Sequence, residues 1–279
     1  MSGQIIGMHE WLATPPGQYL LAWERAQMAQ SVANVFGYHA LQLGLPELDA
    51  LEANRMPHRW LATQTTLETT VPAEDSNNTG QPVALVTDFS ALPFTANSLD
   101  LVVMPHSLEL SADPHGVLRD VARVLVPEGR VVICGLNPLS LWGFCQRRPQ
   151  WFSWMGAERL LLPSSGECIG YLRLRDWLSL LNLEIEDGRF GCYRPAFSSQ
   201  AWLHRVNWMD KAGARWWPIL GSVYCLVAVK RVRGMTLINA ARHPVRRLSV
   251  APVTVANNTA SIRATGQNDL QVEQSGQVS

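Results

Sequence analysis

The stretch from Pro82 to Asn137, PVALVTDFSALPFTANSLDLVVMPHSLELSADPHGVLRDVARVLVPEGRVVICGLN, decides the fold of this 279-residue chain. Its apolar runs predict a buried strand in 82–88, a second strand in 99–107 and a third in 130–137. A helical pattern in 112–129 separates the second strand from the third. The order strand, turn, strand, helix, strand is typical of a doubly wound parallel sheet, which binds ligands at the carboxyl ends of its strands.

The helix expected within 112–129 has marked ends. Asp113 can cap the free N–H groups of the first turn, and Pro114 suits the first helical position. Pro127 and Gly129 are expected to stop the helix. Apolar residues recur between these ends at helical spacing and predict one buried stripe: Val117, Leu118, Val121, Val124 and Leu125.

Further elements flank this stretch on its N-terminal side. The pattern predicts a helix over 18–36, in which Glu24 stands on an otherwise apolar stripe and Gly37 is the stop. Residues 38–44 predict a short buried strand, and 58–63 a weaker one. The polar stretch 66–81 is interpreted as a loop.

On the C-terminal side, 174–182 predicts a helix, 183–195 begins as a strand, and 222–232 is a well-marked final strand. From 233 onward the chain is rich in polar residues without periodicity. That composition is typical of a disordered tail.

Three motifs in this order resemble those of a known family: DFSALPFTANSLDLVV (88–103), HSLEL (106–110) and LRDVARVLVPEGRVVI (118–133). They are similar to the class I S-adenosylmethionine-dependent methyltransferases, and more narrowly to the type 11 methyltransferase domain. The resemblance implies an α/β fold with a doubly wound, seven-stranded, mostly parallel sheet and an antiparallel final strand. It implies an N-terminal extension at 1–17, a methyltransferase-like domain at 18–232 and a tail at 233–279.

The resemblance also suggests which residues bind the cofactor, S-adenosylmethionine. Asp88 would accept a hydrogen bond from the adenine amino group, and Phe89 would lie on the adenine face. Gly44 matches the first glycine of the family's glycine-rich turn. His106 and Ser107 end the next strand and would face the same crevice. His106 is the candidate general base, because histidine titrates near neutral pH; the alternative is a strand-end histidine that is merely solvated or hydrogen-bonded.

The chain departs from the family at the glycine-rich turn, which here is LQLGLPELDAL (41–51). Pro46 and Leu48 occupy the second and third glycine positions, and Gln42 stands where the family has an acid. At the end of the strand expected in 58–63, where an acid would bind the ribose hydroxyls, the chain has Thr63 and Gln64. Two hypotheses therefore stay open: an active methyltransferase, and a binding or regulatory module that has lost cofactor affinity.

A tryptophan-rich insert near 138–170 is interpreted as a cover over an aromatic or apolar small-molecule substrate, or else as core packing beneath a lid. Aromatic residues near its arginines suggest a third interpretation, docking to a partner or a membrane surface. The nucleophile of the substrate and the oligomeric state are not indicated.

Composition narrows the function classes. The formal net charge is zero, which disfavours nucleic-acid binding. Five scattered cysteines without a CxxC pattern favour reduced thiols over a metal site. No signal peptide and no run long enough for a transmembrane segment stand out, so a cytoplasmic protein is expected. A nicotinamide dehydrogenase is disfavoured, because the turn lacks G-x-G-x-x-G.

Overall fold

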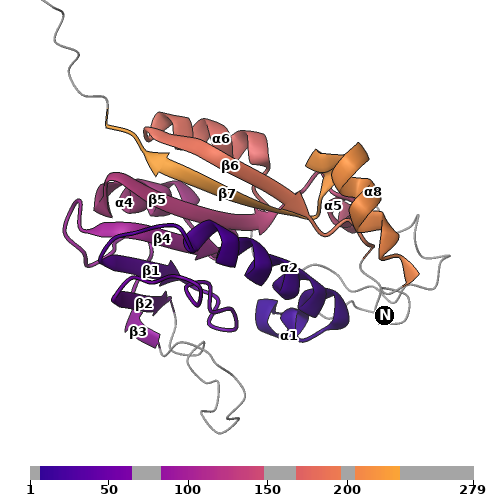
Figure 1. Ribbon diagram of the computed structural model, residues 1–279, viewed down its shortest axis with the longest axis horizontal. Coiled ribbons are helices and arrows are strands. Elements are labelled where there is room, and N and C mark those ends of the chain that lie inside the picture. Colours follow the sequence, from indigo (N-terminus) through magenta and orange to yellow (C-terminus); the bar gives the residue numbers. More distant parts are fainter. Residues whose placement is uncertain (1–6, 65–82, 148–167, 196–204, 233–279) are drawn as a thin grey trace, which may run out of the picture. The chain divides into compact units, whose positions relative to one another are not determined.

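The computed structural model describes residues 7–64, 83–147, 168–195 and 205–232 (Figure 1). Seven strands form one sheet in the order β3-β2-β1-β4-β5-β7-β6. Strand β7 is antiparallel to its neighbours β5 and β6, whereas β1 to β5 pair in parallel. The predicted fold class is thereby confirmed. The strands are β1 (His39–Leu43), β2 (His58–Thr63), β3 (Val83–Val86), β4 (Leu99–Pro105), β5 (Leu125–Leu136), β6 (Leu183–Gly191) and β7 (Val223–Lys230).

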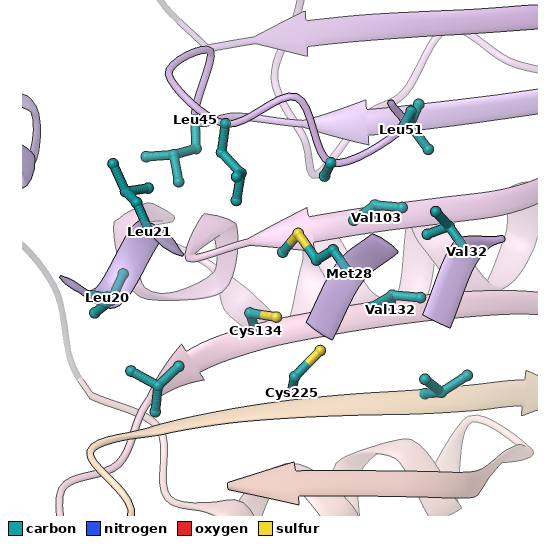
Figure 2. Close-up of a cluster of buried hydrophobic side chains, with 14 of the residues drawn as sticks. Leu20, Leu21, Met28, Val32, Leu45, Leu51, Val103, Val132, Cys134 and Cys225 are labelled. Carbon is teal, nitrogen blue, oxygen red and sulfur yellow. The ribbon is translucent and has the colours of Figure 1, made fainter. Parts of the chain in front are cut away.

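Helices cover both faces of this sheet. Buried residues of α2 pack in one cluster, and those of α4 and α6 pack in a second cluster against the other face. Figure 2 shows Met28 and Val32 of α2 lying over β4 and β5. The helices are α1 (Met8–Leu12), α2 (Pro15–Val32), α3 (Ser107–Leu110), α4 (Pro114–Val124), α5 (Leu141–Arg147), α6 (Tyr171–Leu180), α8 (Trp208–Trp216) and the 3-10 helix η4 (Pro218–Leu220).

The helix predicted over 18–36 runs instead from Pro15 to Val32. Thr14 caps it, because its hydroxyl accepts a hydrogen bond from the Gly17 N–H at 3.4 Å. Gly37 is not its stop. The helix ends earlier, where the buried Asn54 amide donates hydrogen bonds to the carbonyl of Val32 (2.9 Å) and that of Val35 (3.2 Å).

The start of α4 is confirmed and its predicted stop is wrong. The Asp113 carboxylate accepts a hydrogen bond from the Gly116 N–H at 2.9 Å. At the other end Leu125 already pairs with Leu99 of β4, and the register then jumps so that Arg130 is opposite Leu101. Pro127 and Gly129 therefore lie in a bulge inside β5, next to Glu128 with a φ of 64°.

The strand predicted within 82–88 is not buried as a whole. In β3, Val83 and Leu85 are half-buried, while Ala84 and Val86 are exposed. The physical reason is its place at the edge of the sheet, where β2 is its one partner among the described strands.

Three predictions concern segments outside the described residues: the loop at 66–81, most of the tryptophan-rich insert and the tail from 233. Within the described part, Trp11 and Leu12 of α1 also belong to the core, N-terminal to the predicted domain start at 18. All described residues fall in one compact unit, Met1–Arg233.

Candidate functional site

A small pocket of about 20 Å³ lies at the carboxyl ends of β1, β2 and β4. Gly44 follows β1, Gln64 follows β2, and Ser107 follows β4. This is the edge at which doubly wound sheets bind ligands. Three of the predicted cofactor-binding residues are in its lining, which consists of Met8, Gly44, Leu45, Gln64, Phe89, Ser107 and Leu110.

Gly44 keeps this pocket open. Its φ of 73° lies in the left-handed region, which favours glycine. A Cβ at this position would lie 3.4 Å from Ser107 Oγ and 3.6 Å from Phe89 Cε2, so a side chain would take up the space between them. The Ser107 hydroxyl donates a hydrogen bond to the carbonyl of Leu43 and so ties the end of β4 to the end of β1.

Asp88 and Phe89 follow β3 and differ in exposure. Phe89 is buried, with its ring in the pocket wall, whereas Asp88 is exposed. One Asp88 carboxylate oxygen accepts a hydrogen bond from the Ser90 N–H at 2.9 Å, and this bond lowers the pKa of the carboxyl group. Asp88 is therefore an ionised hydrogen-bond acceptor at neutral pH.

Gln42 organises the turn that replaces the family's glycine-rich sequence. Its buried amide nitrogen donates to the carbonyls of Gly44 (3.2 Å), Leu45 (3.0 Å) and Leu48 (2.7 Å), and its oxygen accepts from the Ala50 N–H at 2.9 Å. Leu48 is buried in the core rather than in the pocket. The described turn between β1 and β2 contains no α-helix, so this turn offers no helix N-terminus to the pocket.

His106 is fully buried and is not part of the pocket lining. Its Nε2 lies 2.7 Å from Glu24 Oε1 of α2, and its Nδ1 lies 2.9 Å from Glu109 Oε2 of α3. Burial lowers the pKa of the imidazole, but the two carboxylates outweigh burial and raise this pKa to about 10. His106 is therefore a cation held between two anions, not a solvent-facing base.

Sequence reasoning missed the partners of His106 and the role of Gln42. One signal was present: Glu24 stands on the apolar stripe of its helix, and a charged residue on a buried face needs an ionic partner. For Gln42 no sequence signal was available, because its hydrogen-bond partners are backbone atoms of a turn without periodicity.

A second, larger pocket of about 380 Å³ lies among α5, α8 and η4. It adjoins the residues that follow β5 and precede β7, at the same edge of the sheet. Its lining is mainly aromatic and aliphatic: Leu139, Ser140, Leu141, Phe144, Tyr193, Trp208, Met209, Ala212, Gly213, Trp217 and Leu220. Trp142, in the same insert, is instead packed in the core edge-on against Trp11, at 5.7 Å between ring centroids.

Comparison with known proteins agrees with this architecture. The model of a family described as a methyltransferase domain matches residues 53–133. The uncharacterized protein YafS of Escherichia coli (strain K12) is 30% identical over 234 residues, which cover 81% of this chain and 82% of YafS.

Two solved structures share the fold at low sequence identity. One is a chain from the complex between the Haloferax volcanii Trm112 methyltransferase activator and a methyltransferase. It has a TM-score of 0.54 and 16% sequence identity, and the match covers 81% of this chain and 98% of that chain. The other is an S-adenosylmethionine-dependent methyltransferase from Archaeoglobus fulgidus. It has a TM-score of 0.51 and 15% sequence identity, and the match covers 75% of this chain and 94% of that chain.

The sheet order, with an antiparallel β7 between β5 and β6, is that of a methyltransferase fold, and a small pocket lies at its strand ends. Because residues 53–133 match the methyltransferase-domain model, the chain contains a class I methyltransferase domain, and YafS is its relative over most of the chain. Among the described residues, no helix is long and apolar enough to cross a membrane.

Proposed function

We propose that this protein transfers a methyl group from S-adenosylmethionine to a small molecule with an apolar or aromatic surface. The observation that carries the proposal is the pocket in which Gly44, Phe89 and Ser107 meet, with Asp88 adjacent to Phe89 in the sequence. The match to the methyltransferase-domain model supports it.

The residues present fit the nucleoside end of this cofactor. The missing Cβ at Gly44 leaves the Phe89 ring edge uncovered on that side, and the ionised Asp88 is an acceptor suited to an amino group. The pocket of about 20 Å³ would have to widen to admit an adenine ring. Toward the methionine end, Gln42 uses its amide on the turn, so no carboxylate from β1 is available there. We therefore expect cofactor affinity about ten- to a hundredfold below that of a site with a charge-assisted bond at that position.

The chemistry makes modest demands on the protein. When bound, S-adenosylmethionine supplies an already activated methyl group. The chain then has to orient the acceptor and exclude water, and orientation alone can contribute on the order of 7–11 kcal/mol to lowering a barrier. His106 would serve as a positioning residue that fixes the end of β4 against α2, since its ring is buried between Glu24 and Glu109.

The acceptor would bind in the second pocket. Its aromatic lining and its place at the same edge of the sheet support this assignment. Ser140 contributes a hydroxyl to a lining that is otherwise largely apolar, which favours a substrate with few polar groups.

A second function, a binding or regulatory module without catalysis, is favoured by one observation. The Gln42-bound turn lacks the helix N-terminus on which this kind of fold can receive an anionic group. Such a module would keep the apolar pocket and would not bind the cofactor.

Calorimetric titration with S-adenosylmethionine and S-adenosylhomocysteine separates the two functions. We expect saturable binding by the wild-type protein and at least tenfold weaker binding by Asp88→Ala, since a charge-assisted hydrogen bond is lost. Asp176→Ala, which removes another exposed carboxylate on α6, is the matched control and should bind as the wild type does. Absence of binding at millimolar ligand would leave the module as the function.

A further inference from the structure

Exposed aromatic and aliphatic side chains gather around the mouth of the second pocket. Trp208, Trp216 and Trp217 are 66%, 70% and 59% exposed. Four aliphatic or aromatic neighbours are exposed as well, and we call the seven residues together the aromatic face: Leu139, Phe144, Trp208, Trp216, Trp217, Ile219 and Leu220. A cluster of this kind on a water-exposed surface marks an interaction site.

One side of α8, which we call its inner side, packs against the rest of the domain and fixes the orientation of the helix. Gly213 lies against Tyr193, and Asp210 accepts a hydrogen bond from the Tyr19 hydroxyl at 2.5 Å and pairs with Arg194 at 2.7 Å. The outer side is therefore the opposite one. It carries the exposed Trp208, Lys211 and Arg215, which follow one another at i, i+3 and i+7 spacing.

The charge of this outer side is positive. Residues 205–220 contain three cations, Arg205, Lys211 and Arg215, and one acid, Asp210. Because Asp210 is paired with Arg194 on the inner side, its charge does not offset Lys211 and Arg215. The whole chain has no net charge, so this excess is local.

We propose that the aromatic face, together with Lys211 and Arg215, docks on an anionic lipid bilayer. Tryptophan side chains, apolar with one N–H donor, favour the depth of the lipid headgroups, and lysine and arginine beside them are attracted to anionic lipids. The second pocket then opens toward the bilayer, where an apolar molecule dissolved in it can enter. The docking depends on this surface alone and does not require methyl transfer.

Flotation with lipid vesicles tests the docking. The full-length protein is expected to float with vesicles that contain about a third anionic lipid, and much less with neutral ones. Lys211→Glu/Arg215→Glu should lower the partition coefficient at least tenfold, because each cation near such a surface contributes about fivefold. Trp208→Ala/Trp216→Ala should lower it several-fold on both kinds of vesicle.

Matched variants on other helices control for general effects of charge and hydrophobicity. Arg119→Glu/Arg175→Glu on α4 and α6 reverses two exposed cations, and Leu172→Ala/Leu180→Ala removes two exposed leucines from α6. Both should float as the wild type does. All replaced residues are exposed, and circular dichroism of each variant verifies the fold.

Two results would overturn the proposal. One is equal flotation of the wild type and the α8 variants, or flotation of neither. The other is a monomer–dimer equilibrium in sedimentation experiments without lipid that Trp208→Ala/Trp216→Ala abolishes, since the aromatic face would then be an interface between two copies of the chain.

Discussion

His106 joins three elements through charge. It directly follows β4 and has a φ of 53°, a conformation that histidine and asparagine adopt more readily than most residues. Its ring holds Glu24 of α2 and Glu109 of α3, and Glu109 also accepts a hydrogen bond from the Leu136 N–H of β5. Burying the two carboxylates is tolerable only while the imidazolium lies between them.

This arrangement predicts a pH-dependent stability. Below about pH 6.5 both the folded and the unfolded chain hold the His106 proton. Between that pH and the raised pKa of about 10, only the folded chain keeps the proton, so the free energy of unfolding falls as pH rises. Urea denaturation across this range should show the decrease for the wild type and a smaller one for His106→Asn.

His106→Asn keeps a residue suited to the backbone conformation and removes the cation. At about pH 6 we expect it to lose roughly 3–5 kcal/mol of stability, because two buried carboxylates lose their partner. His115→Asn, which replaces an exposed histidine of α4, is the matched control. The same pH slope in the wild type and His106→Asn would contradict the ionic role of His106.

The turn between β1 and β2 is an element held by one side chain. Gln42 supplies a donor to three carbonyls and an acceptor to one N–H, a combination that an amide has and a carboxylate lacks. The glutamine at the family's acid position therefore belongs to a different turn, in which Pro46 and Leu48 are buried instead of glycines.

Gln42→Glu restores the residue type of the family motif and tests this explanation. We expect the variant to lose at least 1–3 kcal/mol of stability, because a carboxylate would face three carbonyl oxygens and leave them without a donor. Thermal and urea unfolding measure the loss. Gln64→Glu, at the end of β2 beside the pocket, is the control. A Gln42→Glu protein as stable as the wild type would refute the role of the amide.

At the scale of the whole molecule, the described strands and both core clusters lie between residues 7 and 232. A chain ending at Arg233 should therefore unfold with the same midpoint and denaturant slope as the full chain. A chain ending at Ala228 should be strongly destabilised. It lacks Val229, buried opposite Arg130, and Lys230, whose ammonium donates to the Leu125 carbonyl at 2.7 Å.

A loss of more than about 1 kcal/mol on truncation at Arg233, outside the spread of most surface changes, would show that residues beyond 233 contribute to the folded domain.

The sequence was sufficient to predict the elements whose apolar residues recur at strand or helix spacing. It predicted the strands around β4 and β5 and the Asp113 cap of α4. It could not predict the edge position of β3, because strand neighbours are set by the whole sheet. Pro127 and Gly129 were wrongly predicted to end α4, because strand pairing decides their place as well. Once Leu125 pairs with Leu99, a bulge within β5 accommodates both residues. Of the candidate site, Gly44, Phe89 and Ser107 were brought together as expected, while the burial of His106 depends on α2.

The measurement that tests the central claim most directly is a crystal structure of the protein with S-adenosylhomocysteine. We predict the adenine beside Phe89 and Gly44, with its amino group within hydrogen-bond distance of the Asp88 carboxylate. A structure in which the ligand binds elsewhere, or in which the Gln42-bound turn and Phe89 close this pocket against it, would contradict a cofactor site at the carboxyl ends of β1, β2 and β4.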